Sequence, residues 1–62
     1  MSQKKFKFDL SQAVRIAASG ETGQITGRAE YLHSENNYYL HYQAADGRAV
    51  EQWWPESMLL PA

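Results

Sequence analysis

The sequence predicts an all-β protein in which five short strands close into a small barrel, with one short helical turn before the last strand. Three observations support this class. Turn-forming clusters recur along the chain, the runs between them alternate with a period of two, and no run repeats apolar residues at helical spacing. The clusters, rich in Gly, Asn, Asp and Ser, are SGETG (19–23), HSENN (33–37) and AADG (44–47).

The first two strands are predicted on either side of the first cluster. In AVRIAA (13–18), Val14 and Ile16 alternate with Arg15. The second strand is QITGRAEYL (24–32). Because side chains alternate between the two faces of a strand, one face of this second strand should present Ile25, Gly27, Ala29 and Tyr31.

The third and fourth strands are YYLHYQ (38–43) and RAVEQWW (48–54). Alternation divides each of them into two faces. In the third strand Tyr38, Leu40 and Tyr42 share one face, opposite Tyr39 and His41, and in the fourth Val50, Gln52 and Trp54 share one face, opposite Ala49, Glu51 and Trp53.

The chain changes direction after the second tryptophan. Pro55 has no N–H and cannot continue a strand ladder, so we expect a single helical turn over Pro55–Ser57. MLLPA (58–62) then forms the closing strand. Five strands with this turn in so short a chain describe an SH3-like barrel, and closure would protect apolar faces and strand edges that a flat sheet exposes.

Composition predicts a single small domain. The 62 residues contain no cysteine, and no third ligand accompanies His33 and His41 at metal spacing, so neither a disulfide nor a metal site is expected. We expect a flexible basic tail over residues 1–7 and one barrel domain over residues 8–62. No apolar run suits a signal peptide or a membrane span, which predicts a cytoplasmic protein without a membrane partner.

The charges are divided along the chain. Lys4, Lys5 and Lys7 lie in the tail, whereas residues 8–62 hold three arginines against seven acidic residues, a net charge of −4. A surface that binds phosphates needs the opposite sign, so nucleic acid is not favoured as a partner.

The aromatic residues, 13% of the chain, are the most informative side chains. The expected aromatic core is Phe8, Tyr31 and one of Trp53 and Trp54. The two tryptophans must point to opposite faces of their strand, and Trp54 shares its face with Val50, which we expect to point inward.

The outward tryptophan can form an aromatic patch. Such a patch serves as a groove for a proline-rich peptide, as a cage for a methylated ammonium group, or as a contact between copies of the chain. The acidic neighbours Glu51 and Glu56 suit a cation or a basic peptide, and contact between copies suits so small a domain. The residues that can line this binding surface are Tyr38, Tyr39, Tyr42, Glu51, Gln52, Trp53 and Trp54.

An ordered set of residues resembles a known family. It comprises F-x-L-x-x-x-V-R (8–15), SG (19–20), GQIxG (23–27) and a late V-x-Q-x-aromatic-P (50–55). In this order they resemble the plasmid-borne, trimethoprim-insensitive type II dihydrofolate reductases, with one small insertion before Ser19. The resemblance implies an SH3-like barrel, a homotetramer around a central pore, and an origin on a mobile element.

The resemblance also implies a site. A pore strand of that family binds dihydrofolate and NADPH, and its glutamine, isoleucine and tyrosine fall on Gln52, Trp53 and Trp54. The pore lysine falls on Ile16 or Ala17, which carry no charge, and Glu51 adds a negative charge. This exchange opposes the binding of anionic ligands.

A second, weaker resemblance involves VRIAASGETGQITG (14–27), which is similar to KOW and Tudor-type barrels that bind nucleic acid or peptides. Any hairpin of such a barrel needs the same glycine turn.

The sequence therefore favours a small binding or assembly module that forms a homo-oligomer through the aromatic strand 50–54. Its ligand would be a peptide or a small molecule, and no cofactor or catalytic residue is predicted. The alternatives are an NADPH-dependent dihydrofolate reductase of type II and a KOW-like or Tudor-like binder.

Overall fold

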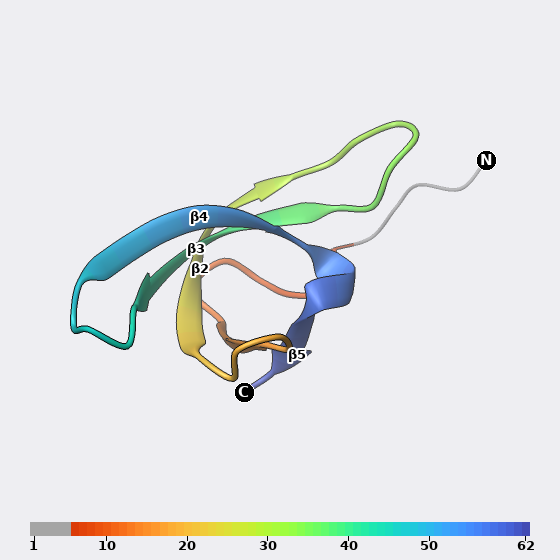
Figure 1. Cartoon of the computed structure of the whole chain (residues 1–62). Coiled ribbons are helices and arrows are strands. Elements are labelled where there is room, and N and C mark those ends of the chain that lie inside the picture. The colour runs from red at the N-terminus through yellow and green to blue at the C-terminus, as the bar shows by residue number, and fades with distance from the viewer. Residues whose placement is uncertain (1–5) are drawn as a thin grey trace.

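The computed structural model describes residues 6–62, and within them it shows one antiparallel sheet of five strands and a single 3₁₀ turn (Figure 1). Lys4 and Lys5 of the expected tail lie outside the described residues. The elements are β1 (Ala13–Ile16), β2 (Thr22–Ala29), β3 (Asn37–Gln43), β4 (Ala49–Pro55), the 3₁₀ turn η1 (Glu56–Met58) and β5 (Leu59–Pro61).

The strand order is β4-β3-β2-β1-β5, with antiparallel neighbours throughout. The prediction of five strands and one short helical turn before the last is confirmed. The turn begins one residue later than expected because Pro55 still pairs with Asn37 at the end of β4. The sheet is strongly curved (Figure 1), but β4 and β5 are its two outer strands and do not pair, so the predicted closure into a barrel is not confirmed.

Two of the predicted turns rest on glycines that need a left-handed backbone. Gly20, between β1 and β2, has φ of 80°, and Gly47, between β3 and β4, has φ of 91°. A side chain with a Cβ is strained in this region, so glycine suits both turns. The first turn joins β1 to β2 and the second joins β3 to β4 in antiparallel hairpins.

The core lies on the concave face of the curved sheet. Alternation along the strands selects its members, and Phe8, only 1% exposed, is in the core as predicted. Val50 and Trp54 of β4 pack against this core from its margin. The buried apolar residues are Phe8, Val14, Ile16, Ile25, Tyr38, Leu40, Tyr42 and Leu59.

A β-bulge at Thr26 changes the predicted faces of β2. Ile25 pairs with Leu40, but Gly27 pairs with Tyr39, so β3 has no residue opposite Thr26. An extra residue reverses the phase of every later side chain. The prediction that Gly27, Ala29 and Tyr31 share one face with Ile25 is therefore wrong.

Tyr31 is likewise not a core residue, because its side chain is 44% exposed beyond the end of β2. The fully buried tyrosine of the core is Tyr38.

Candidate functional site

The open edge of β4 presents unpaired backbone groups. Pro55 has no N–H, yet it occupies a regular pairing position opposite Asn37. In an antiparallel ladder, hydrogen-bonded pairs alternate with pairs whose N–H and C=O groups point away from the partner. Pro55 belongs to the second kind, because the backbone N–H of Glu56 donates to the Asn36 carbonyl at 2.9 Å.

The hairpin end of β4 fixes the same phase. The backbone N–H of Ala44 donates to the Arg48 carbonyl at 2.8 Å. In the next pair, Gln43 with Ala49, the N–H and C=O groups therefore again point away from the partner strand. Between the two ends, Glu51 and Trp53 direct their N–H and C=O groups to the open edge. The remaining β4 residues, Val50, Gln52 and Trp54, form the hydrogen-bonded pairs with β3.

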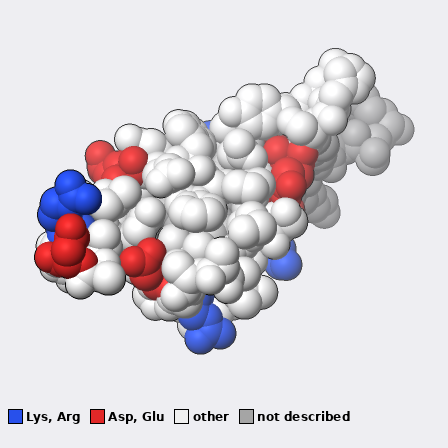
Figure 2. Space-filling model, in the orientation of Figure 1, with Lys and Arg blue, Asp and Glu red and all other residues white. Residues whose placement is uncertain are grey.

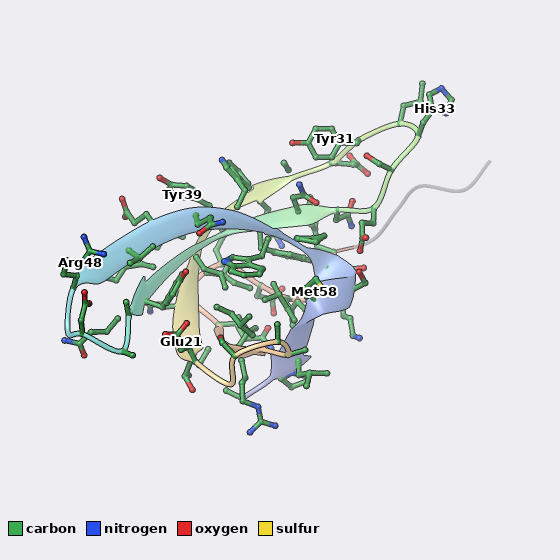
Figure 3. All side chains as sticks on the ribbon, viewed as in Figure 1. Glu21, Tyr31, His33, Tyr39, Arg48 and Met58 are labelled. Atoms are coloured by element: carbon green, nitrogen blue, oxygen red, sulfur yellow. The ribbon has the colours of Figure 1, made fainter. Side chains whose placement is uncertain are left out.

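Trp53 and Tyr39 form an aromatic pair on the convex, outer face of the sheet. Their ring centroids lie 4.9 Å apart with the planes tilted by 45°, and Trp53 is 46% exposed. Gly27 leaves room for them, because a Cβ at Gly27 would lie 3.2 Å from the Tyr39 Cβ and 3.8 Å from the Trp53 ring. Figure 3 shows Tyr39 and Tyr31 pointing away from the concave interior.

Polar side chains follow in the next row of the same face. His41 lies opposite Glu51, with 3.5 Å between Nδ1 and the carboxylate Oε2, and Gln24 lies opposite His41 on the other side. Because these positions share the phase of Tyr39, they present one continuous surface with the aromatic pair.

A shallow groove of about 480 Å³ crosses this polar region. Its lining contains no lysine, arginine, aspartate or glutamate. The side chains that line it from outward positions are Ala13, Thr22, Gln24, His41, Gln43 and Ala49, and Gly23, Tyr42 and Gly47 complete the lining.

The strongest polar cluster lies on the concave face. The Tyr38 hydroxyl accepts hydrogen bonds from the backbone N–H groups of Lys7 at 2.9 Å and Phe8 at 3.3 Å, and donates one to Glu56 Oε2 at 2.5 Å. Burial and the bond to Glu56 raise the pKa of Tyr38. This cluster attaches residues 7 and 8 to the sheet and to η1.

Glu56 is held in its charged form by the same cluster. Burial alone would raise its pKa, but hydrogen bonds from Tyr38, from the Lys7 N–H and from Asn36 outweigh burial and lower it. We assign this carboxylate a structural role, since its hydrogen-bonding partners belong to the attachment of the N-terminal segment.

The structure separates the seven residues of the predicted binding surface. Tyr39, Glu51 and Trp53 lie together on the outer face, whereas Tyr38 and Tyr42 are buried in the core. Trp54 packs against the core. Gln52 is exposed, although alternation places it on the same face of β4 as Val50 and Trp54.

Sequence reasoning missed the polar part of the outer face, Gln24, Gln43 and Thr22. Alternation could place Gln43 beside His41 and Tyr39, but only the register between β2 and β3 shows that Gln24 joins them.

Charged side chains are scattered over the face seen in Figure 2. Figure 2 shows acidic and basic groups dispersed over the viewed face, without a large patch of one sign. Residues 6–62 contain no group of three His, Cys, Asp or Glu side chains suited to a metal ion, and no helix long and apolar enough to cross a membrane.

No protein-family model, curated protein or solved structure matches this chain.

Proposed function

We propose that the chain is a small binding or assembly module of the SH3-like barrel type that self-associates through β4, residues 50–54. The open edge of β4, where Glu51 and Trp53 direct backbone N–H and C=O groups outward, carries this proposal. A strand edge of this kind pairs readily with another strand, and a second copy of the chain offers an identical one.

The barrel architecture is supported by the connection between the outer strands. Closure would bring the two outer strands together at η1, the three residues that join the end of β4 to the start of β5, and would leave the edge of β4 at Glu51 and Trp53 open. The curvature of the sheet in Figure 1 runs in the direction that closure requires.

The exposed apolar surface also favours association. Trp53 on β4 and Leu60 on β5 remain 46% and 42% exposed in the single chain. A domain of this size buries little apolar surface alone, and association is a common means of burying more.

Two proline substitutions test the proposal. Glu51→Pro removes an N–H that points to the open edge, so the single chain should keep its fold while association weakens at least about tenfold. Gln52→Pro removes an N–H from the ladder with β3 and should unfold the chain. Molar mass by light scattering across a dilution series measures association, and circular dichroism measures folding.

Glu51→Ala is the matched control, because it removes the carboxylate and keeps the N–H. A wild-type chain that stays monomeric at millimolar concentration would overturn the proposal, and so would a folded Glu51→Pro variant that associates like the wild type.

A type II dihydrofolate reductase is the second candidate. It is favoured by Gln52, the residue that matches the pore glutamine of that family, because Gln52 is exposed at the margin of the sheet next to Trp53. Consumption of NADPH that requires dihydrofolate and is lost in Gln52→Ala would support this candidate. Absence of turnover in an assembled wild-type sample would reject it.

A further inference from the structure

The outer face of the sheet carries two neighbouring rows of different chemistry. One row crosses the sheet through Gly27, Tyr39 and Trp53, and the next crosses it through Gln24 and His41. Two residues along a strand advance by about 7 Å, so the aromatic row lies directly beside the groove. A ligand that extends over this distance would contact both rows.

The groove surface is mostly apolar, and the polar side chains that line it carry no formal charge apart from a protonated histidine. Gln24 and Gln43 each contribute an amide that both donates and accepts hydrogen bonds, and His41 contributes an imidazole. The Nε2 groups of the two glutamines donate to the Ser11 carbonyl at 3.3 Å and to the Gly47 carbonyl at 3.0 Å, which orients the amides.

Both amides keep acceptor capacity. No hydrogen bond within residues 6–62 reaches the Oε1 atom of Gln24 or Gln43. The lining also includes small residues, Ala13, Gly23 and Ala49.

This chemistry discriminates among ligand classes. A phosphate would meet no lysine or arginine in the lining, and the Glu51 carboxylate beside the groove lies 3.5 Å from His41 Nδ1. Single-stranded nucleic acid also stacks on aromatic rings, but it needs a positively charged groove for its backbone. A neutral ligand with many hydroxyl groups and one apolar ring face can form hydrogen bonds with the polar row and pack its ring face on the aromatic row.

We propose that the outer face of β2, β3 and β4 binds a neutral oligosaccharide. One sugar ring stacks on the Trp53–Tyr39 pair, and the hydroxyls of the next ring bond to Gln24, His41 and Gln43. Trp53 belongs both to this site and to the self-association segment 50–54, whereas the groove lining contains no residue of that segment. The double variant Gln24→Ala/Gln43→Ala therefore tests sugar binding without changing the edge of β4.

The test is a titration of the full-length protein with cellohexaose, maltohexaose and hexa-N-acetylchitohexaose, which are all neutral, each supplied separately. Tryptophan fluorescence and the side-chain amide signals of the glutamines in ¹H–¹⁵N NMR spectra are the two readouts. We expect at least one of these sugars to shift the amide signals of Gln24 and Gln43 together with the Trp53 indole signal. A short oligouridylate tested in parallel reports nucleic-acid binding.

Variants then locate the site. Trp53→Ala and the double variant Gln24→Ala/Gln43→Ala should each lower the affinity for the sugar at least about tenfold. Removal of one or two good contacts causes a loss of this size. Leu32→Ala, at a side chain 85% exposed in the β2–β3 connection, is the control that should bind like the wild type.

Three results would overturn the proposal. They are the absence of shifts with all three sugars at millimolar concentration, binding that survives in both outer-face variants, and oligouridylate binding without sugar binding. Should Trp53→Ala fail to fold, Trp53→Leu and the double glutamine variant test whether the sugar binds on the outer face.

Discussion

Tyr38 and Tyr39 are consecutive residues of β3, yet they lie in opposite environments. Tyr38 is fully buried, and its hydroxyl takes part in three hydrogen bonds on the concave face. The Tyr39 ring packs against the Trp53 ring at a tilt of 45° on the convex face, and its hydroxyl has no hydrogen-bonding partner within residues 6–62. One face of the sheet therefore supports the fold, and the other is available for binding.

The two tryptophans repeat this comparison on β4. Trp54 packs against the core, and its indole Nε1 is buried without an acceptor in the described part of the chain. Trp53 is 46% exposed. The comparison teaches that residue type alone does not assign a function to an aromatic side chain in so small a sheet, because phase along the strand decides it.

The largest expected effect separates Trp54 from Trp53. Trp54→Ala should lower the free energy of unfolding by about 3 kcal/mol, because it leaves a cavity beside the core. Trp53→Ala should lower it by about 1 kcal/mol, since only the ring pair with Tyr39 is lost. Urea denaturation at one fixed protein concentration measures both, and equal losses would contradict the assignment of the two faces.

Trp54→Phe sharpens this result. It keeps a ring against the core and removes the unpaired N–H, so it should be much less destabilising than Trp54→Ala.

An intermediate effect separates the two tyrosines. Tyr38→Phe leaves the Lys7 and Phe8 N–H groups and the Glu56 carboxylate without their shared partner, and should cost about 2 kcal/mol. Tyr39→Phe should be neutral to within about 0.5 kcal/mol. Thermal unfolding followed by circular dichroism compares the pair, and a Tyr39→Phe variant as unstable as Tyr38→Phe would remove the distinction between the faces.

The smallest effect is a dependence of stability on pH. The pKa of Glu56 is lowered in the folded chain, so the unfolded chain binds the proton first as the solution is acidified. The stabilisation is complete above the ordinary value of 4.5 and is lost as pH falls through the lowered folded-state pKa. Glu56→Gln should reduce this acid sensitivity by less than about 1 kcal/mol.

Urea denaturation of the wild type and of Glu56→Gln, from neutral pH to below 4.5, follows this difference. A variant with the same acid dependence as the wild type would show that Glu56 does not contribute to it.

Much of the fold could be predicted from local signals. Turn residues placed the connections, and alternation placed five strands within a few residues of their observed ends. Alternation also assigned the two faces of β3 and β4, so Tyr39, Glu51 and Trp53 could be grouped before any tertiary structure was known. These features follow from the short-range geometry of an extended chain.

The candidate site could be predicted only in part. The aromatic pair belongs to adjacent strands joined by a short turn, and its phase is visible in the sequence. Gln24 comes from β2, and its place beside His41 depends on the register between β2 and β3. A non-local pairing of this kind leaves no periodic signal in one strand.

The sequence by itself determined the all-β class, the number of strands, the helical turn near Pro55 and the burial of Phe8, because turn chemistry and alternation act over a few residues. Only the tertiary structure decided that Tyr31 leaves the core, that β4 is an open edge and that a groove forms on the outer face. The open edge and the groove follow from the order of the strands and the register between them, which are non-local, and the change of face along β2 follows from the bulge at Thr26. One extra residue reverses the face of everything that follows it in β2, and whether it forms depends on packing against β3, which the sequence of β2 does not contain.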